Sequence, residues 1–306
     1  MINTSNKFKV AAAQLSSVFM NKKKSVQKAC RSIEAAAKRG AKLIVFPEAF
    51  IAGYPDWVWV TPGFKKPILS KMYSELLQNA VIFPDETSKK LSATAKKNKI
   101  HVIIGVSERN SEASNSSVFN SILFFDDKGA FIGKHRKLIP TGTERLVWAQ
   151  GDGSTLNVYD TSVGKIGGLA CWENFMPLVR TALYKQGIQI LAVPTWDSSE
   201  GWQISMRHQA KEGGMFIINC CQAIKMKDIP NKYEFKSNYP HDREWINKGN
   251  SCVIDPTGKI IAGPVSEKEE IIYSDIDLDA IAEAKWIFDV AGHYSRPDIF
   301  EFRVRK

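Results

Sequence analysis

Short apolar runs alternate with amphipathic stretches through the first hundred residues of the chain. The apolar runs occupy residues 8–13, 42–46 and 101–106. Apolar residues recur at helical spacing in residues 26–37, 67–80 and 85–98. A run that is apolar throughout is typical of a strand buried on both faces, whereas spacing of three or four residues is typical of a helix with one buried face. The alternation therefore predicts a layered α/β fold.

Two pairs of short runs later in the chain are separated by tight-turn sequences. The pairs are residues 118–125 with 130–137 and residues 251–255 with 259–262. The connecting sequences are Asp-Asp-Lys-Gly and Asp-Pro-Thr-Gly, and the second has proline at the position that a type I turn favours. Both pairs are predicted to be antiparallel hairpins. Because the rest of the pattern is β-α-β, the sheets are expected to be mixed.

The run at 164–170 ends at Cys171, where a strand is expected to turn sharply into a helix. Pro177 favours a helix start, Gly187 favours its end, and residues 188–193 are predicted to form the next buried strand. A cysteine at such a turn is held out from the strand end, near backbone N–H groups that can receive negative charge. This placement presents a nucleophile, although a buried, inert thiol is the commoner state of a strand-end cysteine.

The last third of the chain continues the α/β pattern. Helices are predicted at 200–213 and 277–288, and strands at 215–220 and 271–276. Residues 223–249 are predicted to be a long polar loop, which makes them the candidate for a variable lid. Residues 290–306 have no regular period but carry Phe300, Phe302 and Val304, so they are expected to be a C-terminal arm at a subunit interface.

Composition is that of an ordinary globular protein. Hydrophobic residues make up 44% and charged residues 24% of the 306 residues, which leaves no room for extensive disorder. Residues 1–306 are therefore expected to form a single compact domain. The net charge is +10, but the lysines lie in short scattered clusters and not in a basic tail. Such clusters are usually solvated helix faces, so no nucleic-acid partner is predicted.

The five cysteines are an odd number and include no C-x-x-C pair. Neither a disulfide framework nor a zinc site is indicated, and no metal is expected. The N-terminus is polar, and no stretch approaches the roughly 20 apolar residues of a membrane span. These features predict a cytoplasmic protein without a membrane partner.

Three residues stand where chemistry is usually placed. Glu48 comes just after the buried run at 42–46, Lys137 ends the first hairpin, and Cys171 occupies the turn described above. Each also has a plainer explanation. Glu48 would serve equally as a surface loop carboxylate, and the basic cluster around Lys137 as a charged edge strand that resists mispairing.

The sequence around these residues resembles the nitrilase superfamily of carbon–nitrogen hydrolases. The matching motifs are FPEAF at 46–50, HRKL at 135–138 and CWEN at 171–174. The resemblance covers nearly the whole chain, and CWEN is similar to the nitrilase and cyanide-degrading branch. It implies a four-layer α-β-β-α sandwich with mixed sheets. It also implies a catalytic set of Glu48, Lys137 and Cys171, with Glu144 supporting Lys137.

The chemistry of a nitrile is consistent with this set. A nitrile carbon is a weak electrophile, so attack requires a soft, strong nucleophile and a group that stabilises charge on nitrogen. A lysine about 4 Å from the sulfur would favour the thiolate by about 4 kcal/mol at an effective dielectric of about 20, and a glutamate equally near would oppose it by a similar amount. We therefore expect a neutral resting thiol at Cys171, with Glu48 taking its proton during attack. Lys137 and the backbone N–H of Trp172 are expected to stabilise the developing charge.

Three aromatic residues, Tyr54, Trp172 and Trp196, lie next to or shortly after these positions and are expected to line the substrate site, although core packing explains them equally well. His135 and His208 are expected to be structural, because Glu48 already fills the role of base.

The expected reaction is hydrolysis of an organic nitrile to the carboxylic acid and ammonia, through a cysteine thioimidate and thioester, without a cofactor. A cyanide dihydratase or an aliphatic amidase on the same scaffold is the enzymatic alternative. A non-catalytic scaffold or basic polyanion-binding protein is the alternative from another class. The expected partners are a small-molecule nitrile and a second copy of the chain, in a homodimer or higher homo-oligomer.

Overall fold

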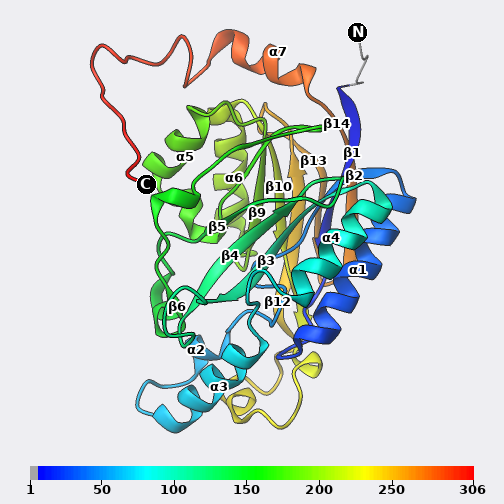
Figure 1. Ribbon diagram of the computed structural model, residues 1–306, viewed down its shortest axis with the longest axis vertical. Coiled ribbons are helices and arrows are strands. Elements are labelled where there is room, and N and C mark those ends of the chain that lie inside the picture. The colour runs from blue at the N-terminus through cyan, green and yellow to red at the C-terminus, as the bar shows by residue number, and fades with distance from the viewer. Residues whose placement is uncertain (1–5) are drawn as a thin grey trace.

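Two mixed sheets form the centre of the computed structural model, which describes residues 6–306 (Figure 1). The first sheet has the order β14-β1-β2-β3-β4-β5, with β6 paired to β4. Its strands are β1 (Lys7–Gln14), β2 (Ala41–Val45), β3 (His101–Arg109), β4 (Val118–Phe125), β5 (Phe131–Arg136), β6 (Trp148–Ala149) and β14 (Glu270–Asp277).

The second sheet has the order β11-β12-β10-β9-β8-β7, with β13 paired to β12. Its strands are β7 (Tyr159–Thr161), β8 (Gly164–Gly168), β9 (Ile190–Thr195), β10 (Phe216–Cys221), β11 (Ala223–Lys225), β12 (Trp245–Ile254) and β13 (Ile260–Ser266). Parallel pairs lie at the centre of each sheet, and antiparallel hairpins flank them. The mixed strand direction and both predicted hairpins are therefore confirmed.

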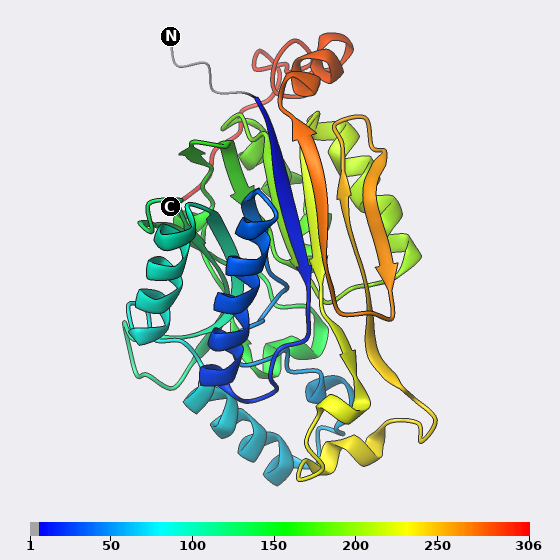
Figure 2. The same ribbon diagram turned by 90° about the vertical axis from the view of Figure 1, so that its right-hand side faces the viewer.

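Helices cover the outer face of each sheet. The helices are α1 (Lys22–Lys38), α2 (Trp57–Val60), α3 (Lys66–Asn79), α4 (Glu86–Asn98), α5 (Pro177–Tyr184), α6 (Glu200–Gly213) and α7 (Asp279–Ile287). Helices α1 and α4 pack on the first sheet, and α5 and α6 pack on the second. Figure 2 shows these layers from the side, with blue α1 and yellow-green α6 on opposite flanks. The predicted α-β-β-α sandwich is confirmed.

The two sheets meet through an apolar interior. Val45 and Ile103 from the first sheet share one buried cluster with Ile190 and Ile218 from the second. The central strands are consequently buried on both faces, which is why their sequences are continuous apolar runs and not alternating ones.

Local capping fixes the ends of the helices. Helix α4 begins after Asp85, whose side chain accepts the N–H of Ser88, while the Ser88 hydroxyl accepts the N–H of Asp85. Helix α6 begins after Ser199, whose hydroxyl accepts the N–H of Trp202, and it ends before Gly214 in a left-handed conformation. These are signals that the sequence carries locally.

The segment at 223–249 differs from its prediction as a polar loop. It contains β11 and the beginning of β12, and its apolar side chains are buried. The buried apolar side chains of this segment are Ala223, Ile224, Ile229, Tyr233, Phe235, Tyr239 and Ile246. All of them except Ala223 share a cluster with the 49–60 region and α3. The prediction failed because these residues are spaced irregularly among polar ones, so no period reveals a buried face.

The C-terminal residues follow α7 across the surface and reach α5 (Figure 1). They form no helix or strand, and Phe300 is 71% exposed. Phe302 packs against the α5 side of the second sheet's helical layer, where the Lys185 ammonium lies 5.7 Å from the centre of its ring.

None of the helices in the described part of the chain combines the length and the apolar character needed to cross a membrane.

A close approach between β3 and the turn after β2 determines where Glu48 lies. A side chain at Gly105 would place its Cβ 2.3 Å from the carbonyl oxygen of Pro47 and 2.8 Å from the Cα of Glu48. The backbone of Ile51 also hydrogen-bonds to the Gly105 carbonyl, at 3.2 Å. Only glycine allows the turn to lie this close to the sheet.

We expect Gly105→Ala to lower the free energy of unfolding by about 1–3 kcal/mol, because the added methyl must displace the backbone around Glu48. Urea unfolding midpoints measure this effect. Gly201→Ala is the matched control, because a Cβ at that helical position meets no atom within 4 Å. Equal midpoints for Gly105→Ala and the unaltered protein would show that the turn has room to move.

Candidate active site

Cys171 occupies the turn between β8 and α5. Residues Cys171–Phe175 form one short 3-10 turn, and Cys171 has a φ of +50°, an uncommon value for a residue with a side chain. The residue is 4% exposed, and the hydroxyl of Thr195 at the end of β9 donates to its sulfur at 3.3 Å. The strained backbone holds the thiol just beyond the end of β8, as the sequence predicted.

Glu48 lies just beyond β2 and is fully buried. Its Oε1 atom accepts a hydrogen bond from the Asn120 amide at 2.7 Å and another from the Lys137 ammonium at 2.9 Å. The side-chain amide of Gln222 donates to its main-chain carbonyl at 3.0 Å. Glu48 is therefore not the surface loop carboxylate that was its plainer explanation.

Lys137 follows β5 and is buried between two carboxylates. Its Nζ atom lies 2.9 Å from Glu48 and 2.8 Å from Glu144. β5 is the edge strand of its sheet, and Lys134 and Arg136 pair with Glu108 nearby. The plainer explanation of a charged edge strand holds for those two residues and fails for Lys137.

Glu144 joins this charged cluster to the aromatic residues around it. One oxygen accepts the Tyr54 hydroxyl at 2.6 Å, and the other accepts the Lys137 ammonium and the N–H of Thr141. The Trp59 indole N–H in turn donates to the Tyr54 oxygen at 3.1 Å. The predicted supporting contact between Glu144 and Lys137 is present in the structure.

The titration behaviour of the cluster follows from its burial. Burial raises the pKa of Glu48 to about 7, against the opposing charge of Lys137. Burial and the Glu48 charge raise the pKa of Cys171 to about 12. Burial alone would lower the pKa of Lys137, but Glu48 and Glu144 raise it above its usual value. At neutral pH the thiol is protonated and the ammonium charged, in the direction expected from the sequence.

Glu173 links the turn at Cys171 to the segment after β5 that contains Lys137. Its buried carboxylate accepts the N–H of Leu138 at 2.7 Å and the N–H of Ala170 at 3.0 Å. It also pairs with His135, whose other ring nitrogen lies 3.2 Å from the Thr155 carbonyl. His135 is thus fully engaged in a structural contact.

His208, the other histidine considered as a base, lies away from this cluster. Its side chain is 70% exposed and faces Glu212, one turn further along α6.

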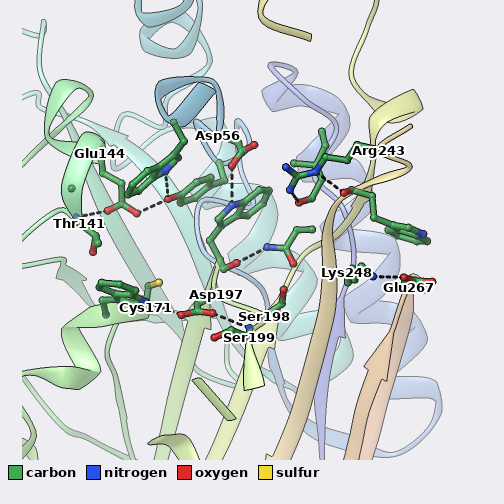
Figure 3. A pocket seen from close by; sticks show the side chains of 18 of the residues that line it. Asp56, Thr141, Glu144, Cys171, Asp197, Ser198, Ser199, Arg243, Lys248 and Glu267 are labelled. Carbon is green, nitrogen blue, oxygen red and sulfur yellow. Dashed lines mark hydrogen bonds and ion pairs between the residues drawn. The ribbon is translucent and has the colours of Figure 1, made fainter. Parts of the chain in front are cut away.

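A cavity of about 1020 Å³ opens beside the thiol (Figure 3). Cys171 and Glu144 line it, whereas Glu48 and Lys137 are buried behind it. Its walls are largely aromatic and polar, and they include Tyr54, Asp56, Trp59, Thr141, Trp172, Trp196, Asp197, Ser198, Ser199, Arg243, Trp245 and Asn247. The three predicted substrate-site aromatics are all among them.

Two carboxylates hold these aromatic walls in place. Trp172 donates its indole N–H to Asp197 at 2.8 Å, and Trp196 donates to Asp56 at 3.0 Å. Trp196 also stacks on Tyr54, with ring centroids 4.2 Å apart and planes 7° from parallel. The Tyr239 hydroxyl donates to Asp56, so the 223–249 segment is attached directly to the cavity wall.

The sequence did not point to four residues that complete the site: Asp56, Asn120, Thr195 and Gln222. Only Asn120 carried a usable signal, because it is a polar residue inside the apolar strand β4. The others come from turns and strand ends, where a polar residue is unremarkable.

No group of three His, Cys, Asp or Glu side chains in residues 6–306 has the arrangement of a metal site.

Comparison with known proteins agrees with these features. A model of the carbon–nitrogen hydrolase family matches residues 9–285. The chain is 41% identical over 318 residues to Nitrilase 3 of Arabidopsis thaliana, which covers 100% of this chain and 89% of that protein. It is 41% identical over 302 residues to the bifunctional nitrilase/nitrile hydratase NIT4B of Nicotiana tabacum, which covers 97% and 86%.

A crystal structure of Saccharomyces cerevisiae Nit3, a member of branch 10 of the nitrilase superfamily, matches with a TM-score of 0.73. The sequences are 25% identical, and the match covers 95% of this chain and 97% of the yeast chain. Family model, full-length relatives and fold all agree with the resemblance carried by the three motifs. The chain therefore belongs to the carbon–nitrogen hydrolase family, within the nitrilase superfamily.

Proposed function

We infer that this protein is a nitrilase that hydrolyses an organic nitrile to the carboxylic acid and ammonia. The plant relatives named above match nearly the whole chain at 41% identity, so the inference does not rest on an isolated motif. The observation that carries it is that Cys171 and Glu144 line one large cavity, and that Lys137 is buried between Glu144 and Glu48.

We propose that the reaction starts with transfer of the Cys171 proton to Glu48. The S–H bond breaks, an O–H bond forms on the carboxylate, and the sulfur electron pair forms a bond to the nitrile carbon. One π pair of the C≡N bond moves to nitrogen, which takes the proton from Glu48. The product is a neutral thioimidate on Cys171, and Glu48 is ionised again.

Two water molecules complete the reaction. The first adds to the thioimidate carbon as Glu48 takes a proton from it and passes that proton to nitrogen. The new hydroxyl then gives its proton to the nitrogen, ammonia leaves as the C–N bond breaks, and the C=O bond of a thioester forms. The second water hydrolyses the thioester to the carboxylic acid and returns the thiol proton to Cys171. If sulfur leaves the tetrahedral intermediate in place of ammonia, the product is an amide.

Lys137 is assigned the stabilisation of charge that builds first on nitrogen and then on oxygen. Its ammonium is held by two carboxylates, so it is already oriented before the reaction starts. Glu144 maintains the charge of Lys137 and orients it, together with Tyr54 and Thr141. The backbone N–H of Trp172 is proposed as a second donor to the developing negative charge.

The function is tested by measuring the products formed from an aromatic nitrile, an aliphatic nitrile, an amide and cyanide. We expect acid and ammonia from an aromatic or aliphatic nitrile, and loss of this activity in Cys171→Ala, since the nucleophile is removed. Mass spectrometry with a slow nitrile should find the adduct on Cys171. Cys30→Ala, which alters a half-buried thiol outside the site, is the matched control.

Two results would contradict this function. Turnover of an amide or of cyanide alone would identify an amidase or a cyanide dihydratase on the same scaffold. Unchanged hydrolysis by Cys171→Ala, together with steeply salt-dependent DNA binding, would favour a polyanion-binding protein.

The pKa of Glu48 predicts the pH dependence of the reaction. Glu48 accepts a proton only when ionised, so kcat/KM should fall about tenfold per pH unit below about pH 7. A pH profile of kcat/KM measures this decrease, which is the acidic limb of the profile. Glu48→Gln should lose about 100-fold to 10,000-fold in rate. An acidic limb near the ordinary glutamate pKa of about 4.3 would remove Glu48 from this role.

We also propose that residues 1–306 act as one hydrolase domain whose 290–306 arm lies at a subunit interface. Support comes from apolar side chains that α7, the arm and α5 expose, namely Leu178, Trp286, Ile287, Tyr294, Ile299 and Phe300. A second copy covering them would remove this surface from water. All five cysteines are unpaired, which supports a cytoplasmic location.

The full chain is expected to sediment as a dimer or larger assembly at micromolar concentration. Phe300→Ser, at a 71% exposed side chain, should weaken that assembly because less apolar area is buried. Exposed Ile204→Ser on α6, outside the arm, is the comparison variant. Sedimentation of the unaltered chain as a monomer would reject the interface.

A further inference from the structure

Asn120 is a buried polar residue on the apolar strand β4. It is 1% exposed and lies opposite Ser107 of β3 in the strand register. Its main-chain carbonyl accepts the N–H of Lys137 at 2.8 Å, one residue beyond the end of β5. Its side-chain amide donates to Oε1 of Glu48 at 2.7 Å. Asn120 therefore contacts two residues of the proposed catalytic set: the carboxylate of Glu48 and the backbone of Lys137.

The two oxygens of the Glu48 carboxylate have different environments. Oε1 accepts from both the Asn120 amide and the Lys137 ammonium, which occupies its two lone pairs. Oε2 is buried and receives no hydrogen bond from any group in residues 6–306. Leaving a buried carboxylate oxygen without a donor costs free energy, and such atoms in a folded protein point to a functional demand.

We propose that Asn120 is a positioning residue for this reaction: it holds Oε1 of Glu48 and so makes Oε2 the oxygen that receives the proton of Cys171. The assignment rests on the proposed nitrilase function and deepens it. A proton arriving at Oε1 would have to displace a hydrogen bond from Asn120 or Lys137, whereas Oε2 has no hydrogen bond in residues 6–306 to lose. The S–H bond breaks and the new O–H bond forms at Oε2, while the electron pair stays on sulfur for attack.

The Asn120 amide also affects how readily Glu48 ionises. The titratable groups that act on Glu48, or whose pKa values Glu48 affects, are Lys137, Glu144, Cys171, Tyr54 and Cys221. Burial raises the pKa of Glu48, and hydrogen bonds from Lys137 and Asn120 lower it. Removing the amide donor should therefore raise the pKa of Glu48 and leave less of the base ionised at neutral pH.

The test is the pH profile of kcat/KM for Asn120→Leu, which keeps the branching and the number of side-chain heavy atoms and removes the donor. We expect the acidic limb to move up by about 1 pH unit, and kcat at neutral pH to fall about tenfold or more, with KM little changed. A general loss of structure would lower the rate at every pH and leave the limb in place. The pH at which the acidic limb lies therefore distinguishes a role of Asn120 in positioning Glu48 from a merely structural role.

Gln222→Met is the matched control. Gln222 is also a buried amide that contacts Glu48, but it donates to the main-chain carbonyl and not to the carboxylate. This variant is expected to lose stability and some activity, without a shift of the acidic limb. Equal shifts in Gln222→Met and Asn120→Leu would overturn the assignment of Asn120.

Asn120→Asp provides a second variant of the same shape if Asn120→Leu does not fold. It replaces the donor by a second carboxyl group beside Glu48, so the acidic limb should move up further than in Asn120→Leu. A limb that coincides with that of the unaltered protein in the folded variant overturns the proposal about Asn120 alone. Absence of nitrile hydrolysis by the unaltered protein would instead overturn the proposed function.

Discussion

The burial of one ammonium group between two carboxylates is the constraint on which the rest of the site depends. Lys137 is fully buried, and its charge is tolerable only because Glu48 and Glu144 lie within 2.9 Å of it. These three residues come from the turn after β2, the end of β5 and the turn that follows. Both the position of the edge strand and the approach of the Glu48 turn to β3 therefore serve a single electrostatic requirement.

This cluster also affects the protonation state of the Cys171 thiol. Two carboxylates and one ammonium give the neighbourhood an excess of negative charge when all three are ionised, which disfavours a thiolate at Cys171. Burial raises the pKa of both Glu48 and Cys171, and the charge of Glu48 raises that of Cys171 further. These shifts favour a protonated thiol over a permanently ionised sulfur, which agrees with the proton transfer proposed above, and the cavity beside the thiol has aromatic side chains in its walls.

Local signals were sufficient for most of the architecture. Apolar periodicity located the central strands and the covering helices, because strands buried on both faces and helices buried on one have different patterns. The cysteine turn was recognisable from an apolar run followed by proline and glycine. The pairing of Glu48, Lys137 and Cys171 came from their resemblance to a family, because no local pattern relates residues so far apart.

The α/β layers, the two hairpins and the turn at Cys171 follow from the sequence alone, since each depends on neighbouring residues. Which polar residues are buried together depends instead on contacts between distant parts of the chain. The contact between Asn120 and Glu48 joins residues 72 positions apart, and the Glu173 contact to Leu138 joins residues 35 apart. The packing of the 223–249 segment was decided in the same way, because its irregularly spaced apolar residues pack against the 49–60 region and α3, which are distant in the sequence.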